Sequence, residues 1–576
     1  MRQTLRLLCS LMIAGCAPTG AAGFDRLVDD WWAFELATDP LRATGVGEHR
    51  YDGQLPFVNP DSLGRYAERR RDFAKRLAAI DTAGMDRQNQ VSHAMLTIQL
   101  DEAIKEFEFG THRIPILVDD GFHIGFARHP NQFRFASVAD YRNYLTRLAS
   151  YPRYNREQVA NMRLGLASGF TMPRVVLEGY ESTIEAHVVD SIPASAFWQP
   201  FAKFPPAVIP DSQAALLAEA RRVIADSVVP AYREFLRFMV DEYRPKARAT
   251  IGAADLPEGR RYYDWLIRTF TTLPLTADSV HRLGLAEVAR IRADMDRVIA
   301  ATGFRGSFGQ FLAFLRTDPR FYPKTPTELL SFAATLAKTA DGKLPALFRM
   351  LPRQPYGVEP VPADLAPKYT AGRYSGAPLE GTRAGAYWVN LYDLPSRPFY
   401  ALPALTLHEA VPGHHLQSAL AKELDNLPAF RRHGYVNAFG EGWGLYSEYL
   451  GIEMGMYRTP YEQFGRLTYE MWRACRLVVD TGIHSKGWTR DQALSFLADN
   501  TALSLHEVRT ETDRYISWPG QALAYKLGEL KIRELRELAT QQLGARFDIR
   551  AFHDAVLRNG SVPLSVLEAE ILAFVR

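Results

Sequence analysis

Apolar residues recur every three or four positions along much of the chain, with charged residues between them. This spacing places the apolar side chains on one face of an α-helix. It is clearest in the segments 31–37, 66–80, 91–109, 212–243 and 277–302. Prolines cluster in the connections between helical segments, where a helix is expected to end. The pattern predicts a mainly α-helical protein.

Runs typical of β-strands are few, and the best are 174–177 and 386–392. We therefore expect a small β-sheet beside the helices. The sequence shows no internal repeat, low-complexity tract or long polar linker that would separate independent domains. Residues 24–576 are accordingly expected to form a single large helical domain.

The composition is that of an ordinary globular protein, with 47% hydrophobic and 23% charged residues. It excludes a wholly disordered or fibrous chain. The 68 Lys and Arg nearly balance the 65 Asp and Glu, so the net charge is only +3. This balance gives no electrostatic reason to expect a nucleic-acid partner. Three cysteines, Cys9, Cys16 and Cys475, are too few for a disulfide framework.

The N-terminal segment 1–22 has the features of a bacterial lipoprotein signal peptide and tether. Two arginines precede an apolar run at 7–15, which is too short to span a bilayer as a helix but suits a signal peptide. The run ends in Ile-Ala-Gly-Cys at Cys16, which resembles a lipobox. We expect a lipid anchor on Cys16 and a protein that faces the periplasm from an envelope membrane. The alternative is an ordinary signal cut near Ala22, which would give a secreted or soluble periplasmic protein.

Three histidines and a glutamate lie close together at His408, Glu409, His414 and His415. Zinc prefers imidazole ligands and keeps one position open when it is catalytic. In the common H-E-x-x-H arrangement, two histidines four positions apart share a helix face, and the glutamate acts as a base. Here Pro412 stands at the fourth position after His408. This concentration of histidine and glutamate predicts a metal site, and the ligand types favour zinc.

The spacing of these histidines does not suit an unbroken helix. Six residues rotate His414 by about 600°, which leaves it roughly 120° away from the face of His408. His415 returns to that face, but about 10.5 Å further along the axis. The proline of Val411-Pro412 lacks an N–H, and the glycine after it permits unusual dihedral angles. We interpret Val411-Pro412 as an insertion that resets the phase, which makes His414 the second ligand and leaves His415 as an alternative.

A third ligand is expected from a later helix. Glu441 follows His414 by 27 residues, and Glu448 lies seven positions further on, on the same helix face. We predict that Glu441 is the third ligand. Glu448 would then contact one of the ligands on the side away from the metal, or replace Glu441 as the third ligand.

Four separated motifs resemble a known family. They read HEAVPGHH from 408, FGEGWGLYSEYLG from 439, VDTGIHSKGW from 479 and RYISWPGQALAYKLG from 514. In this order they closely resemble the bacterial domain-of-unknown-function 885 family, which looks similar to helical zinc peptidases related to angiotensin-converting enzyme, neurolysin and thermostable carboxypeptidases. The resemblance implies a mostly α-helical, two-lobed body with a central cleft, a gluzincin-type zinc site and peptide substrates. The inserted residues between the histidines depart from the H-E-x-x-H pattern.

The resemblance also implies catalytic roles. Glu409 would accept a proton from the attacking water, at a zinc ion held by the predicted ligands. Related peptidases stabilise the oxyanion with a tyrosine and a histidine from the C-terminal region. Tyr525 is the favoured tyrosine, and Tyr515 is less favoured.

His484 is a further candidate catalytic residue. It could hold a substrate carbonyl or orient Glu441, with Asp480 fixing its tautomer. A structural role for this pair is the alternative.

Substrate binding is expected to involve arginines and a strand. Arg473, Arg476 and Arg514 are candidates to bind the carboxylate of a peptide, because the guanidinium fork matches a carboxylate. The strand-like segment 386–390 could pair with an extended substrate, or it could be an ordinary buried strand.

The leading hypothesis is a zinc-dependent hydrolase that cleaves peptide bonds of short peptides, with Glu409 as general base. An amidase acting on the stem peptides of the cell wall would use the same chemistry. A non-catalytic peptide-binding lipoprotein is the alternative from another class.

Overall fold

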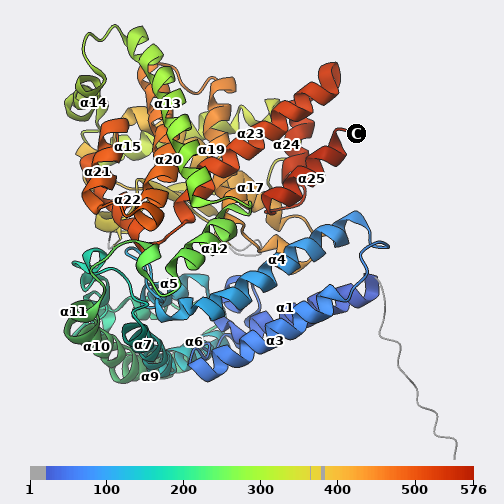
Figure 1. Ribbon diagram of the computed structural model, residues 1–576. Helices are drawn as coiled ribbons and strands as arrows, with labels where there is room; N and C mark the ends of the chain where they lie inside the picture. Colours follow the sequence, from blue (N-terminus) through green and yellow to red (C-terminus); the bar gives the residue numbers. More distant parts are fainter. Residues whose placement is uncertain (1–20, 364, 378–382) are drawn as a thin grey trace, which may run out of the picture.

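The computed structural model describes residues 21–363, 365–377 and 383–576. This part of the chain is mainly α-helical, with one small sheet, as the sequence predicts. Figure 1 shows two layers: the blue-to-green N-terminal helices lie below, and the helices from α13 onward lie above. The predicted signal segment falls on residues 1–22, of which 1–20 lie outside the described residues.

The N-terminal part consists of eleven described α-helices. They are α1 (Ala21–Thr38), α2 (Pro40–Gly45), α3 (Pro60–Ala78), α4 (Arg87–Phe109), α5 (Phe122–Arg128), α6 (Val138–Ala149), α7 (Tyr151–Ser168), α8 (Ser182–Glu185), α9 (Pro210–Val223), α10 (Val229–Arg237) and α11 (Arg244–Lys246).

The C-terminal part carries the remaining described helices. They are α12 (Gly259–Thr271), α13 (Ala277–Thr302), α14 (Phe308–Thr317), α15 (Pro326–Asp341), α16 (Leu402–Glu409), α17 (His414–Lys422), α18 (Ala429–Arg432), α19 (Asn437–Glu453), α20 (Pro460–Lys486), α21 (Arg490–Asn500), α22 (Leu505–Ser517), α23 (Ala524–Leu543), α24 (Ile549–Leu557) and α25 (Leu564–Phe574).

Helix α13 illustrates how local sequence sets these boundaries. It covers the predicted segment 277–302. Thr276 and Ser279 form a capping box at its start, which satisfies backbone N–H groups that have no partner inside the helix. Gly303 ends it with a φ of 73°, in the left-handed region that glycine adopts without cost.

The sheet has three strands in the described part of the chain, in the order β1 (Tyr356–Pro360), β3 (Gly385–Val389), β2 (Gly372–Ser375). β1 runs parallel to β3, and β2 runs antiparallel to it. The strand predicted at 386–392 is therefore confirmed as β3. Because β3 is central and both its edges are paired, it is the ordinary buried strand of the two alternatives and has no free edge for a substrate.

The second predicted strand does not form. Residues Arg174–Leu177 make a 3-10 turn, in which the N–H of Val176 donates to the carbonyl of Pro173 at 3.3 Å. A run of four residues, three of them apolar, is too short for periodicity to separate a strand from a turn.

The largest apolar core cluster contains side chains from Phe24 to Ile571, so it includes residues of both parts. No helix among the described residues is both long and apolar enough to cross a bilayer. The assignment of 24–576 to one domain stays a prediction.

Candidate metal centre

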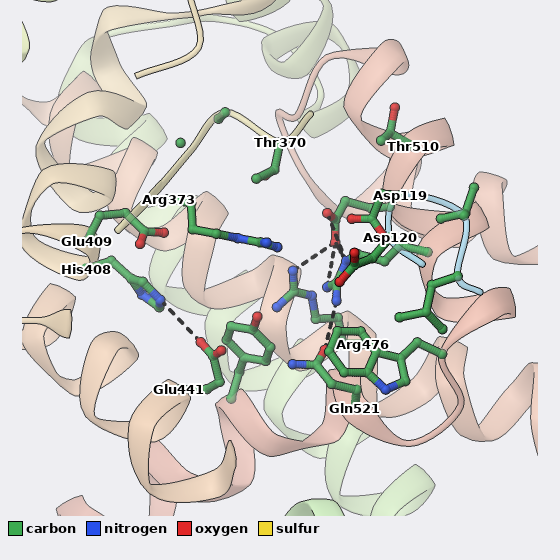
Figure 2. Close-up of a pocket in the computed structure, with 18 of the residues that line it drawn as sticks. Asp119, Asp120, Thr370, Arg373, His408, Glu409, Glu441, Arg476, Thr510 and Gln521 are labelled. Atoms are coloured by element: carbon green, nitrogen blue, oxygen red, sulfur yellow. Dashed lines mark hydrogen bonds and ion pairs between the residues drawn. The ribbon is translucent and has the colours of Figure 1, made fainter. Parts of the chain in front are cut away.

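A cavity of about 680 Å³ takes its walls from both parts of the chain. Its described lining residues with carboxylate, guanidinium or imidazole groups are Asp119, Asp120, Glu178, Arg373, His408, Glu409, His414, Glu441, Arg473, Arg476, His506, Glu511, Asp513 and Arg514. Figure 2 shows His408, Glu409 and Glu441 on one side of the cavity and Asp119 and Asp120 on the other.

His408, His414 and Glu441 bring one ligand atom each within 4.8 Å of one another. Oε2 of Glu441 lies 3.6 Å from Nε2 of His408 and 3.4 Å from Nε2 of His414. A tetrahedral zinc ion with bonds of about 2.1 Å holds its ligand atoms about 3.4 Å apart. The three residues therefore fit a zinc site, both in donor type and in spacing.

A break between α16 and α17 brings the two histidines together. Helix α16 ends at Glu409, the backbone leaves the helical region at Ala410 (φ −92°, ψ −108°), and α17 begins at His414. Glycine is required at Gly413, because a Cβ there would lie 1.8 Å from the carbonyl oxygen of His408. The break changes the helical phase between the histidines at the position that the Val411-Pro412 insertion predicts.

Helix α19 supplies the rest of the centre. Glu441 faces both histidines, and the Nε1–H of Trp443 donates to the carbonyl of Pro412 at 2.8 Å, which ties the break to this helix. Gly444 lets the helix approach closely, since a Cβ there would lie 2.7 Å from the ring of His408. Glu448 accepts from Nδ1 of His408 at 2.8 Å.

The carboxylates around His408 favour its charged form when no metal is present. Burial alone would lower the pKa of His408, but Glu441 and Glu448 outweigh it and raise the pKa to about 9. Burial likewise opposes the charge of Glu441, yet the two histidines hold its pKa well below the usual value. A metal that binds here must displace a proton.

Glu409 lies beside the three predicted ligands and lines the cavity. Its Oε2 accepts from the backbone N–H of Tyr374 at 2.8 Å, so strand β2 fixes the direction of the carboxylate. This arrangement fits the predicted general base. Tyr435 donates from its hydroxyl to Oε1 of Glu441 at 3.1 Å.

The alternative ligand His415 points toward the sheet. Its Nδ1 lies 3.2 Å from the hydroxyl of Tyr374, and its ring packs on Tyr356 at a centroid distance of 4.5 Å. Burial lowers the pKa of His415 to about 4, so it is neutral. The geometry therefore selects His414 as the histidine that faces His408 and Glu441.

The two candidate tyrosines take different positions. Tyr525, at the start of α23, lines the cavity, and its ring centroid lies 6.2 Å from that of His408. Tyr515 is buried elsewhere, and its hydroxyl accepts from Nε1 of Trp472 at 2.7 Å and from Nε of Arg476 at 2.8 Å. Only the position of Tyr525 suits a group that contacts a substrate.

The structure does not bring His484 to the centre. The side chain is fully buried outside the cavity lining; its Nδ1 accepts from the N–H of Ala253 at 3.0 Å, and its Nε2 donates to the carbonyl of Tyr515 at 2.9 Å. Asp480 accepts instead from the hydroxyl of Tyr263 at 2.5 Å and from the N–H of Gly520. The predicted catalytic role of His484 and its pairing with Asp480 are therefore wrong, because backbone groups of neighbouring segments occupy both ring nitrogens.

All three predicted arginines line the cavity, but each already has a carboxylate partner. Arg473 pairs with Glu448 at 3.2 Å, while Arg476 and Arg514 pair with Glu511 at 2.8 and 3.0 Å. They build the wall of the cavity and hold buried carboxylates in place.

Several lining residues escaped the sequence analysis, among them Asp119, Arg373, Tyr374 and Tyr435. They lie in loops and on a short strand, far in sequence from the histidines. The one available signal was Gly440, where a Cβ would lie 2.3 Å from the ring of Tyr435. Glycine inside a helix often marks such a close approach.

Comparison with known proteins places these features in a family. The family described as "Bacterial protein of unknown function (DUF885)" matches residues 40–571. No curated protein matches the chain.

Two solved structures are similar over nearly the whole chain. One is described as a "putative lipoprotein" from Colwellia psychrerythraea, with 29% sequence identity and a TM-score of 0.90, over 96% of this chain and 99% of that one. The other is described as a "putative lipoprotein of unknown function" from Shewanella oneidensis, with 17% identity and a TM-score of 0.70, over 96% of this chain and 100% of that one. The second likeness shows the fold alone.

Proposed function

The chain belongs to the DUF885 family of bacterial proteins of unknown function, and we propose that it is a zinc-dependent hydrolase that cleaves peptide bonds of short peptides. The observation that carries the proposal is the meeting of His408, His414 and Glu441 beside the carboxylate of Glu409. Two histidines and a glutamate, with a further glutamate as base, are the groups of a gluzincin-type site. Zinc held by these residues would supply a Lewis acid and lower the pKa of water.

Glu409 acts as the general base in this proposal. Its Oε2 is held by the N–H of Tyr374. The carboxylate takes the proton of the attacking water and passes it to the leaving amine. Tyr525 donates a hydrogen bond to the developing oxyanion, and burial together with the charge of Glu441 raises its pKa, so the hydroxyl keeps its proton.

The cavity supports short peptides as substrates. Its volume of about 680 Å³ falls among the sites that bind small molecules, about 300–1,000 Å³, and suits a short segment of chain better than a folded protein. Strand β2 lines the cavity, through Gly372, Arg373 and Tyr374. It is an edge strand of the described sheet, and the backbone groups on its free edge other than the N–H of Tyr374 are the ones with which an extended substrate would pair.

Metal analysis tests the proposal. Protein purified without metal-affinity resin should contain one equivalent of zinc, and His414→Ala should lose it. The matched control is His415→Ala, which removes the neighbouring imidazole and should keep the metal. Absence of bound zinc in the unaltered protein, even after zinc is added, would contradict a hydrolase and leave a peptide-binding protein.

Activity is then measured on a library of short peptides, with Glu409→Gln as the inactive control. Peptides that resemble cell-wall stems belong in the library, because an amidase would use the same groups. Cleavage that persists in Glu409→Gln would contradict the assigned base.

We also propose that the chain is a lipoprotein of the bacterial envelope, with lipid on Cys16. The lipobox-like sequence supports this, as does the description of the similar structure from Colwellia psychrerythraea. Labelling with radioactive palmitate should mark the unaltered protein and not Cys16→Ser. Equal labelling, or equal recovery of both proteins in the soluble fraction, would contradict the anchor.

A further inference from the structure

The arginines of the cavity differ in how their charges are balanced. Arg473, Arg476 and Arg514 each lie within ion-pair distance of a buried carboxylate. Arg373 also lines the cavity, yet in the described part of the chain no carboxylate oxygen lies within 4.0 Å of its guanidinium. It is the cavity arginine whose charge a ligand could balance.

Arg373 is held in place beside the predicted reaction centre. It lies on β2 next to Tyr374, whose N–H binds Glu409. Its guanidinium lies 5.2 Å from the ring centroid of Tyr369, which is buried and gives the side chain a flat surface to rest on. Figure 2 shows the side chain reaching into the cavity, between the side of Glu409 and the side of Asp119 and Asp120.

The guanidinium is charged and open to solvent within the cavity. Burial alone would lower the pKa of this group, but Tyr369 and the more distant carboxylate of Asp119 raise it above its usual value. A guanidinium without an adjacent carboxylate keeps its N–H donors free to bind an anion that enters the cavity. The planar guanidinium offers two parallel N–H donors, which match the two oxygens of a carboxylate.

We propose that Arg373 binds a carboxylate of the peptide substrate and so determines substrate specificity. The proposal deepens the proposed function and rests on it for the identity of the substrate as a peptide. Arg373 lines the same cavity as the predicted base, and the backbone N–H of the next residue, Tyr374, binds that base, so the bound carboxylate would lie on the same side of the cavity as Glu409. A C-terminal carboxylate held there would make the protein release short C-terminal fragments. An acidic side chain of the substrate offers the same chemistry.

Binding measurements test this without requiring cleavage. The probes are N-acetylated tetra-alanine with a free C-terminal carboxylate, the same peptide with a C-terminal amide, and an amidated peptide with one aspartate. Dissociation constants are measured by calorimetry on Glu409→Gln protein, with and without Arg373→Gln. One of the two carboxylate peptides should bind the Arg373 protein about tenfold more tightly than the neutral amide, and the ratio should fall to about one in Arg373→Gln.

Which of the two carboxylate peptides binds more tightly shows whether Arg373 binds a C-terminal carboxylate or a side-chain carboxylate. Arg373→Lys should keep part of the preference, because it keeps the charge but loses the fork. Arg383→Gln is the matched control; Arg383 donates to the carbonyl of Gly376 at 3.2 Å, lies outside the cavity lining, and should leave the ratio unchanged.

Equal ratios in the Arg373 and Arg373→Gln proteins would overturn the proposal, as would equal binding of all three peptides to the Arg373 protein. If the proposed hydrolase function is wrong, the protein with Glu409 intact will cleave no peptide, and this result is independent of the binding ratios.

Discussion

Glu448 accepts a hydrogen bond from Nδ1 of His408 at 2.8 Å, on the opposite edge of the ring from Glu441, which faces Nε2. The carboxylate therefore fixes the tautomer of His408 that presents Nε2 to the predicted zinc position. Partners of this kind orient metal-binding histidines in many proteins. Arg473 in turn holds Glu448, at 3.2 Å.

Glu448→Gln should weaken zinc binding without removing a ligand. An amide no longer carries the charge that favours the correct tautomer, and loss of such a partner costs about 10–100-fold in metal affinity. Competition with a chromophoric chelator measures the change. Glu441→Gln, which removes a predicted ligand, should cost more, and an equal or smaller effect of Glu441→Gln would contradict the assigned roles.

Gly444→Ala should disturb the centre from the side of α19. The new methyl group would lie 2.7 Å from the ring of His408, so the imidazole must move. Zinc content should fall, while far-ultraviolet circular dichroism should stay unchanged, because alanine favours the helix. Ile452→Ala, at an exposed position of the same helix, is the control. Full zinc occupancy in Gly444→Ala would contradict the expected steric clash between the new methyl group and the ring of His408.

Tyr525→Phe should lower kcat for peptide cleavage by about 100-fold or more, since one donor to a developing oxyanion is worth about that much. Zinc content should not change. Tyr515→Phe is the matched control; it removes a hydroxyl that binds Trp472 and Arg476, so it should destabilise the fold by about 1–3 kcal/mol and leave kcat intact. The reverse pattern would move the oxyanion role to Tyr515.

Asp480 should make stability fall as the pH rises. Burial raises the pKa of Asp480 from 3.8 to about 7, although Tyr263 and Gly520 partly oppose it. Between these values the unfolded chain has lost the proton that the folded protein keeps, so the free energy of unfolding decreases with pH. The full effect is roughly 4 kcal/mol, reached near pH 7. Urea unfolding at pH 4–8 should show this slope in the unaltered protein and a weaker slope in Asp480→Asn; equal slopes would assign the effect to other groups.

Local patterns predicted the helices and the central strand, because apolar spacing and caps act over a few residues. The motif also predicted that His408, His414 and Glu441 lie together, since Pro412 and Gly413 indicated a change of helical phase between the histidines. Arg373 and Tyr435 could not be predicted in the same way. Arg373 reaches the cavity through packing between segments far apart in sequence, and nothing in its own neighbourhood records it. For Tyr435 the one local sign was Gly440, which leaves room for its ring.

The error at His484 has the same origin. Its position in the VDTGIHSKGW motif said nothing about which backbone groups would face it. In the fold it binds Ala253 and Tyr515, which lie 231 and 31 residues away. Such partners are set by tertiary structure alone.

The break between α16 and α17 has a consequence for recognising proteins of this kind. Within one helix, metal ligands must be a fixed number of residues apart, because each residue rotates the helix by the same angle. Here a turn, tied to Trp443 and made possible by Gly413, sets the separation of the two imidazoles. A text search for two histidines four positions apart passes over this chain, whereas a search for side chains arranged alike in space would find it.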